Sequence, residues 1–219
     1  MNWSPLDQVT QERANNYPVF EQGIIVPAAQ FNGHNFNPDN WRRRVIQAEW
    51  PNGLQTSSPG AIMLEFQNGR YLQGVALVVS WGGMRRSSRI WNSPLGNITQ
   101  ILQQCAMNIQ QTQSIMKSWT LMTEQLSWSA VMASKTLHFL CRALGFQQDP
   151  PVPIDNAIIR MRLWRDFVHG ILYHQRPGNW QGDSLEAYLR YMTAIRVWAN
   201  QRRWTTTEIE TTIFAQYHD

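Results

Sequence analysis

The sequence predicts an α+β fold, in which a small antiparallel β region at the N-terminal end is followed by a helical bundle. Two observations carry this prediction. The spacing of apolar residues changes near residue 92, from short irregular runs to a three- and four-residue periodicity. Before that point, the pair Asn68-Gly69 separates two apolar runs, which is typical of a β-hairpin. We therefore divide the 219 residues into 1–92 and 93–219, expected to form one compact unit with a shared cleft.

The N-terminal region is broken up by prolines, six of them between residues 5 and 59. The one element that we expect before residue 60 is a short helix near 40–49. The apolar runs 61–66 and 71–81 then flank the Asn-Gly pair, so residues 60–81 are predicted to form an antiparallel hairpin. Gly74 lies inside the second run, where a glycine is typical of a β-bulge.

Helical periodicity begins after residue 92. Apolar or small side chains recur at helical spacing along one face of a long amphipathic helix: Ile98, Ile101, Leu102, Cys105, Ile109, Thr112 and Met116. Two shorter helices are predicted next, 119–127 and 134–144, with a break between them. Gly145 is expected to end the second of these helices, because glycine readily adopts the left-handed backbone conformation of a helix C-cap.

Helix-capping residues indicate where the remaining helices start. A proline-containing loop, 147–154, leads to Asp155, whose carboxylate is expected to cap a helix with a narrow apolar face. Capping boxes, in which Asp or Thr is followed three residues later by Glu, begin at Asp183 and Thr205. They predict a helix that ends near Gln201 and a final helix over 206–217.

The basic residues are unevenly divided between lysine and arginine. There are nineteen of them against fifteen acidic residues, giving a net charge of +4, and only Lys117 and Lys135 are lysines. This balance favours an anionic partner, with nucleic acid as the first candidate. Arginine in particular makes forked contacts with phosphate.

Several classes of protein are excluded by composition and motif. The first residues lack the charged and apolar regions of a signal peptide, and no apolar run approaches the ~18 residues needed to cross a bilayer. Two cysteines cannot form a disulfide framework or a four-cysteine metal site, and the histidines show no metal-ligand spacing. We expect a soluble protein of the bacterial cytoplasm or nucleoid, without cofactor or metal.

One stretch of the helical region carries a specific pattern. In Ser129-Ala-Val-Met-Ala-Ser-Lys135-Thr-Leu-His-Phe-Leu-Cys-Arg-Ala-Leu-Gly145, a lysine lies early in a helix. About twenty residues later, Pro151-Val-Pro-Ile-Asp155-Asn-Ala-Ile-Ile-Arg160 presents an aspartate after a Pro-Val-Pro-Ile run. This arrangement resembles the helix-hairpin-helix DNA glycosylase superfamily, in its 8-oxoguanine glycosylase-like branch. The resemblance implies that Lys135 is a catalytic nucleophile and that Asp155 is the essential carboxylate of the same cleft.

The chemistry of base excision explains the pairing of these two residue types. Breaking an N-glycosidic bond builds positive charge on the sugar, which a nearby carboxylate stabilises. A neutral lysine amine that attacks the anomeric carbon gives a Schiff base, which also permits strand cleavage. Taken singly, Lys135 has the alternative interpretation of a solvated lysine and Asp155 that of a plain helix cap. Their order, their spacing and the Pro-X-Pro-Ile approach favour the catalytic interpretation.

The hairpin that precedes the lysine departs from the family pattern. The family has Leu-Pro-Gly-Val-Gly there, with glycines that let backbone amides reach a DNA phosphate. This chain has Leu126-Ser-Trp-Ser-Ala-Val-Met132, which contains no glycine. Phosphate is then expected to be held by amides at the helix start and by the hydroxyl groups of Ser127 and Ser129.

Further DNA contacts are predicted from arginines and aromatic residues. The stretch from Trp81 to Trp91 combines two glycines, three arginines and flanking tryptophans, which suits phosphate contact and base stacking, and equally a solvated loop. On a helical wheel Lys135 shares a semi-polar face with His138, Phe139 and Arg142. We therefore predict DNA-binding roles for the arginines and a base pocket from the aromatic residues: Arg85, Arg86, Arg89, Arg142 and Arg160, and Trp81, Trp91 and Phe139.

The predicted function is that of a monomeric DNA glycosylase, with abasic-site lyase activity, acting on double-stranded DNA after base flipping. The resemblance implies an oxidised purine as substrate, in DNA repair. A hypermodified phage base such as glucosylated hydroxymethylcytosine, in antiviral defence, is the second possibility. Two alternatives remain: a non-enzymatic DNA-binding module that keeps the fold, and a protein-interaction domain whose basic surface is incidental.

Overall fold

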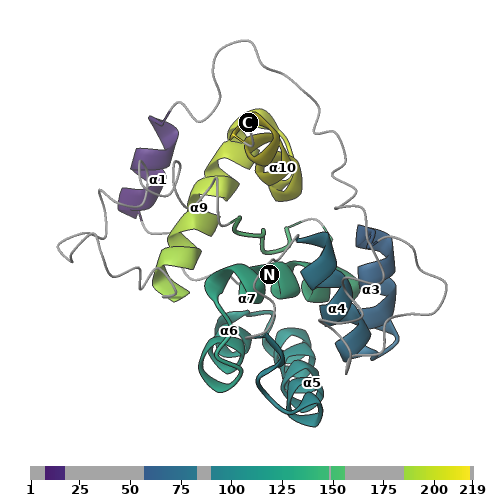
Figure 1. Cartoon of the computed structure of the whole chain (residues 1–219). Helices are drawn as coiled ribbons and strands as arrows, with labels where there is room; N and C mark the ends of the chain where they lie inside the picture. Colours follow the sequence, from purple (N-terminus) through teal and green to yellow (C-terminus); the bar gives the residue numbers. More distant parts are fainter. Residues whose placement is uncertain (1–7, 18–56, 83–89, 148, 156–184, 218–219) are drawn as a thin grey trace. The chain divides into compact units, whose positions relative to one another are not determined.

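The computed structural model describes residues 8–17, 57–82, 90–147, 149–155 and 185–217. Within these ranges the chain forms helices and no strand (Figure 1), so the α+β prediction with an N-terminal β region is wrong. The chain divides into two compact units. Unit 1 comprises residues 1–31 and 148–219, and unit 2 comprises residues 32–147. The boundary expected near residue 92 falls inside unit 2.

In place of the predicted hairpin, unit 2 contains two helices that pack side by side, α3 (Pro59–Gln67) and α4 (Tyr71–Trp81) (Figure 1). The Asn-Gly pair forms the turn between them. Gly69 has a φ of +70°, its amide donates to the Phe66 carbonyl, and the Arg70 amide donates to that of Glu65. This is the Schellman pattern of a helix C-terminus, which demands a left-handed residue just as a tight hairpin turn does. The dipeptide was therefore a correct signal for a turn and a wrong one for strands.

The prediction of a strand for the apolar run 71–81 is wrong for a different reason. All residues from Gly74 to Ser80 are buried, so α4 has no polar face along that stretch and its pattern shows no period. Gly74 is not a β-bulge. A Cβ added there would lie 2.5 Å from Cε1 of Phe66, so the glycine allows α4 to approach the ring on α3.

The long amphipathic helix is present as α5 (Leu95–Thr112), and its apolar stripe is buried from Ile98 to Ile109. The helix ends at Gln113, whose φ of 53° is left-handed, and Met116 lies beyond it and is exposed. There follow α6 (Met116–Thr120) and a π-helical turn, η2 (Leu121–Gln125). Ser118 joins α6 to α5, because its hydroxyl donates to the Cys105 carbonyl over 3.2 Å.

The helix that carries the predicted nucleophile is α7 (Ala130–Ala143). It begins four residues earlier than expected, where the Ser129 hydroxyl caps the Met132 amide. Its predicted end is confirmed: Gly145 has a φ of +94°, and the Phe146 amide donates to the Cys141 carbonyl. Every residue from Ala130 to Cys141 is buried, and the helix packs against α3, α4, α5 and α6. This makes α7 the central helix of unit 2.

Unit 1 contains α1 (Gln8–Asn15), α9 (Leu185–Arg202) and α10 (Thr206–Tyr217). The Trp198 indole on α9 donates to the Ala14 carbonyl at 2.9 Å and ties α1 to α9. The predicted ends of α9 and α10 are confirmed, as is the capping box at Thr205: its amide donates to Glu208, and the Glu208 amide donates back to its hydroxyl. The expected helix at 40–49, the helix after Asp155 and Asp183 itself lie outside the described residues.

In the described part of the chain, no helix combines the length and the apolar character that crossing a membrane requires.

Candidate active site

Lys135 lies in the first half of α7 and is almost completely buried, with 4% of its surface exposed. Its Nζ donates a hydrogen bond of 3.4 Å to the carbonyl oxygen of Gly82, the residue that ends α4. The same nitrogen lies 5.6 Å from the centre of the Trp81 ring, a cation–π distance. The amine is therefore held between α7 and the C-terminal end of α4.

Trp81, one of the residues predicted to form the base pocket, lies beside this amine, and a second one, Phe139, packs against Trp81. The rings of Trp81 and Phe139 meet edge to face, with centroids 4.9 Å apart and planes at 87°. Phe139 is one turn of α7 beyond Lys135 and is fully buried, whereas Trp81 is half-buried. The structure thus brings together Lys135, Trp81 and Phe139, three predicted site residues from two helices.

The semi-polar face expected around Lys135 is wrong, and so is the picture of a solvated lysine. His138 is as buried as the lysine, with 3% exposed. Nη1 of Arg142 lies 3.3 Å from Nε2 of His138. A guanidinium can only donate, so this contact requires Nε2 to be the unprotonated nitrogen. Burial lowers the pKa of the Arg142 guanidinium, which stays charged at neutral pH.

No competing nucleophile is offered by the thiols of the described core. Cys105 and Cys141 are buried and unpaired. Burial raises the pKa of Cys105 to about 12 and also raises that of Cys141. Because only a thiolate attacks efficiently, both cysteines serve as core residues.

The turn before α7 is built by side chains that alternate between inside and outside. Leu126 and Trp128 are buried, and the Trp128 indole donates to the Ile90 carbonyl at 3.2 Å. Ser127 and Ser129 are exposed. Ser127 has a φ of 53°, the left-handed conformation that a glycine adopts most easily. The turn therefore keeps a glycine-like backbone without a glycine.

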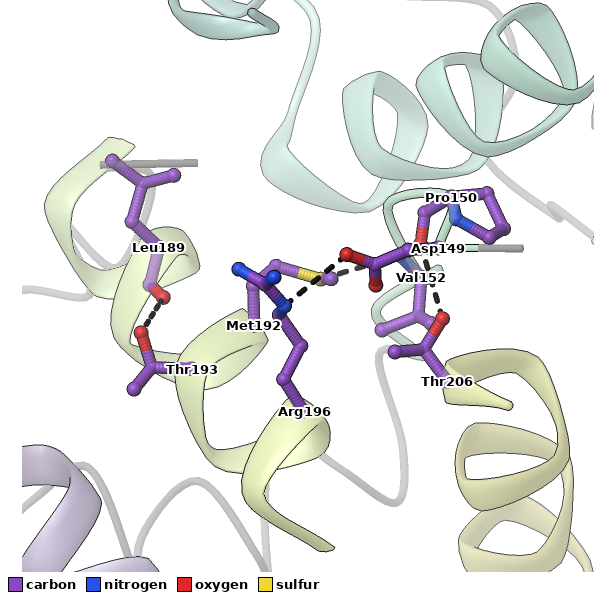
Figure 2. A network of polar contacts seen from close by, with 8 residues as sticks. All are labelled: Asp149, Pro150, Val152, Leu189, Met192, Thr193, Arg196 and Thr206. Carbon is purple, nitrogen blue, oxygen red and sulfur yellow. Dashed lines mark hydrogen bonds and ion pairs between the residues drawn. The ribbon is translucent and has the colours of Figure 1, made fainter. Parts of the chain in front are cut away.

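Asp155 belongs to unit 1, and the described residues 149–155 form an irregular segment that lies against α9 and α10 (Figure 2). The Tyr188 hydroxyl donates to the Val152 carbonyl at 2.8 Å, and the Val152 amide donates to Sδ of Met192 at 3.3 Å. Thr206 donates to the Pro150 carbonyl at 3.4 Å, and Arg196 pairs with Asp149 at 3.1 Å, as Figure 2 shows. Residues 150–154 are buried, while Asp155 is half-buried.

Asp155 and a second acidic group, Glu210, both act on the buried hydroxyl of Tyr191. Glu210 on α10 is buried, with 8% exposed, and so is Tyr191 on α9. Burial raises the pKa of the Tyr191 hydroxyl, and the nearby carboxyl groups of Glu210 and Asp155 raise it further. Tyr191 thus stays a neutral phenol within electrostatic range of the predicted carboxylate.

The other predicted site residues are placed as follows. Trp91 is half-buried, and its indole nitrogen is buried without a hydrogen-bond acceptor in the described part of the chain. Arg85, Arg86, Arg89 and Arg160 lie outside the described residues. Lys135 belongs to unit 2 and Asp155 to unit 1.

Residues that sequence reasoning missed are those that hold the others in place. The Gly82 carbonyl receives the lysine amine, and Tyr188, Met192 and Thr206 hold the segment before Asp155. The two neighbouring glycines after Trp81 were a visible signal that Gly82 has a special place in the structure. The spacing of apolar residues on α9 gives no signal that Tyr188 and Met192 hold the segment before Asp155. Both lie more than thirty residues from Val152 along the chain.

Among the described residues, no three His, Cys, Asp or Glu side chains gather as metal ligands would. The chain as a whole matches no family model, no curated protein and no solved structure.

Proposed function

We propose that this protein is a DNA glycosylase in which Lys135 attacks the sugar of a flipped nucleotide, with abasic-site lyase activity following from the same intermediate. The observation that carries the proposal is the buried Lys135 amine beside the edge-to-face pair of Trp81 and Phe139. Buried lysines are the ones that proteins use as nucleophiles and for Schiff bases, since removal of water disfavours the ammonium form.

The aromatic pair supports the choice of substrate class. A base that has left the duplex needs a surface on which to stack and a pocket that excludes water. The half-buried Trp81 offers an indole within 5.6 Å of the amine, and Phe139 fixes the orientation of that indole. A stacked base would therefore bring its own sugar close to the nucleophile.

The reaction uses the amine twice. Neutral Nζ gives its electron pair to the sugar C1′, and the bond between C1′ and the base nitrogen breaks. The base leaves with the electron pair of the broken C1′–N bond and takes up a proton. Nζ then loses a proton and the C1′–O4′ bond opens with protonation of O4′, which leaves an iminium between Nζ and C1′. Removal of a C2′ proton expels the 3′-phosphate by β-elimination and cleaves the strand.

The proposal gives Asp155 the task of stabilising positive charge on the sugar. Its support is the anchored segment 149–155, because a carboxylate on a well-held backbone is better oriented than one on a free loop. The turn at Ser127 and Ser129 would receive a DNA phosphate. Its exposed hydroxyls and the left-handed backbone at Ser127 support that role.

Borohydride trapping tests the nucleophile. Reduction of the iminium on DNA with an abasic site or a modified base converts it to a stable secondary amine and leaves the protein crosslinked. We expect the crosslink to form with the wild type and with Lys117→Gln, since Lys117 is an exposed lysine on α6. We expect it to be lost in Lys135→Gln while DNA binding remains. Equal trapping by Lys135→Gln would show that another amine reacts.

Identification of the released base tests the reaction and the substrate together. A panel of duplexes, each with one oxidised purine or one hypermodified cytosine, is incubated with the protein, and the free bases are identified by mass spectrometry. We expect release of a base from one class and a large loss of rate in Asp155→Asn. Steep salt dependence of DNA binding without release from any duplex would favour the DNA-binding module. Neither binding nor release would favour the protein-interaction domain.

A further inference from the structure

Gly82 lies where the lysine amine is held, and its lack of a side chain leaves room for that amine. A Cβ added to Gly82 would lie 2.9 Å from Nζ and 3.1 Å from Cδ of Lys135. It would also lie 3.2 Å from the Val78 carbonyl oxygen. The first distance is too short for a real contact between a methyl group and an amine, so Lys135 would have to move.

Backbone conformation does not explain the glycine at this position. Gly82 has φ −78° and ψ 0°, which any residue adopts, and its amide makes the normal helical bond to Val78. An alanine at such a helix end would ordinarily stabilise the fold, because it restricts the unfolded chain more than glycine does. A side chain at this position would instead compete for space with the Lys135 amine.

We infer that Gly82 is a positioning residue for Lys135: its carbonyl oxygen receives the amine, and its missing side chain lets the amine lie over the Trp81 ring. For catalysis this inference rests on the proposed function, whereas the placement of the amine can be tested without DNA. The amine reaches Gly82 from fifty-three residues further along the chain, so a small change at one end of α4 is transmitted directly to α7.

Lysine-selective NMR measures the placement of the amine. In protein labelled with carbon-13 at the lysine Cε, the two lysines give two Cε signals, which Lys117→Gln assigns. We expect Gly82→Ala to move the Lys135 signal and to shift its titration midpoint by about half a pH unit or more. The Lys117 signal should not change. An unchanged Lys135 signal in folded Gly82→Ala would overturn the inference.

Two other glycines provide matched controls. Gly96 lies in the first turn of α5, where an added Cβ meets nothing within 4 Å, so Gly96→Ala should leave the Lys135 signal unchanged. Gly74→Ala should lower the unfolding midpoint, because its Cβ would collide with Phe66, and should leave the titration of Lys135 unchanged. If Gly74→Ala shifted that titration as much as Gly82→Ala, the effect would be general loosening, and the inference would be wrong.

A double substitution distinguishes the effect of the Lys135 amine from that of the other atoms around Gly82. In the Lys135→Ala background, Gly82→Ala should lower the unfolding midpoint much less than in the wild type, since the two nearest atoms, Nζ and Cδ of Lys135, are gone. This comparison still decides the matter if Gly82→Ala alone fails to fold. A folded double variant supports the inference, and an unfolded one overturns it.

Trapping on abasic DNA links the inference to the proposed function. We expect Gly82→Ala to slow formation of the crosslink by about tenfold or more, as misplaced catalytic groups do, and Gly96→Ala to leave it unchanged. If the wild type forms no crosslink but Gly82→Ala still moves the Lys135 signal alone, the proposed function fails and the positioning role stands. If the wild type forms the crosslink and Gly82→Ala forms it equally fast with an unmoved signal, the positioning role fails and the function stands.

Discussion

The two predicted catalytic residues are held by contrasting kinds of structure. Lys135 comes from the middle of a helix whose residues are buried from Ala130 to Cys141. Asp155 belongs to the segment 149–155, which has no regular secondary structure and whose backbone is held by side chains of α9 and α10. In the first case the backbone hydrogen bonds are satisfied within the helix, and in the second they depend on residues far away along the chain.

This difference predicts where each region is vulnerable. Buried backbone groups must find partners, and outside a helix they find them one at a time. The position of α7 should thus depend on the packing of large apolar side chains. The position of segment 149–155 should depend on a few polar contacts, each of smaller energy.

The largest effect is expected from a cavity in the packing around α7. Phe139→Ala removes a fully buried ring that meets Trp81 at 4.9 Å and should cost about 3–5 kcal/mol of unfolding free energy. Urea unfolding, followed by circular dichroism, measures the loss. Leu64→Ala on α3 is the control, because Leu64 is 52% exposed and should change stability by less than about 0.5 kcal/mol. Equal losses in both variants would contradict the view of α7 as a packed centre.

A smaller loss is expected at the segment before Asp155. Tyr188→Phe removes the hydroxyl that donates to the buried Val152 carbonyl at 2.8 Å, which leaves that carbonyl without this partner. The cost should be about 1–3 kcal/mol. Tyr71→Phe is the control in unit 2, where the Tyr71 ring, 6.3 Å from that of Phe66, stays in place. If Tyr188→Phe had the same free energy of unfolding as the wild type, the segment would have to be held by packing, as α7 is.

Helices could be predicted from the sequence where polar residues on one face made the apolar periodicity visible. The stripe from Ile98 to Ile109 and the box at Thr205 and Glu208 each combine a periodic or capping signal with exposed neighbours. The prediction failed for α4 for two reasons. Burial on all sides removes the helical period of its apolar residues, and the Schellman turn at Gly69 uses the same residue types as a hairpin turn. A local signal decides that a turn is present, and longer-range packing decides what it connects.

The same limit applies to the candidate site. The resemblance suggested Lys135, the composition of the stretch 81–91 suggested Trp81, and the helical wheel around Lys135 suggested Phe139. The structure places these three together. Their surroundings were not predictable, because a helical wheel assigns a polar side chain to solvent. The burial of Lys135 depends on the end of α4, which no local pattern relates to α7.

Acid should weaken the start of α10, where Thr206 contacts the Pro150 carbonyl. Hydrogen bonds from the Thr205 amide and hydroxyl hold the pKa of Glu208 below its usual value of 4.5. A depressed carboxyl pKa stabilises the folded state above the unfolded value, and this contribution disappears as the pH falls through the folded value. The contribution should be below about 1 kcal/mol, since the group is exposed. Stability measured between pH 6 and pH 3 should therefore fall more in the wild type than in Glu208→Gln.

The smallest effect is expected at the ion pair of Arg196 and Asp149, at the edge of the same segment. The nitrogen and oxygen are 3.1 Å apart, but the two side chains are 29% and 28% exposed, so water and salt screen their attraction. Arg196→Gln should cost about 1 kcal/mol or less, and the difference from the wild type should shrink between 50 mM and 500 mM NaCl. Arg190→Gln, which breaks the more exposed pair with Glu186 on the same helix, is the control and should cost still less. A loss above that of Tyr188→Phe would mean that charge rather than hydrogen bonding to the backbone holds the segment. The contrast with α7 would then lie in electrostatics, and the position of Asp155 would depend on ionic strength.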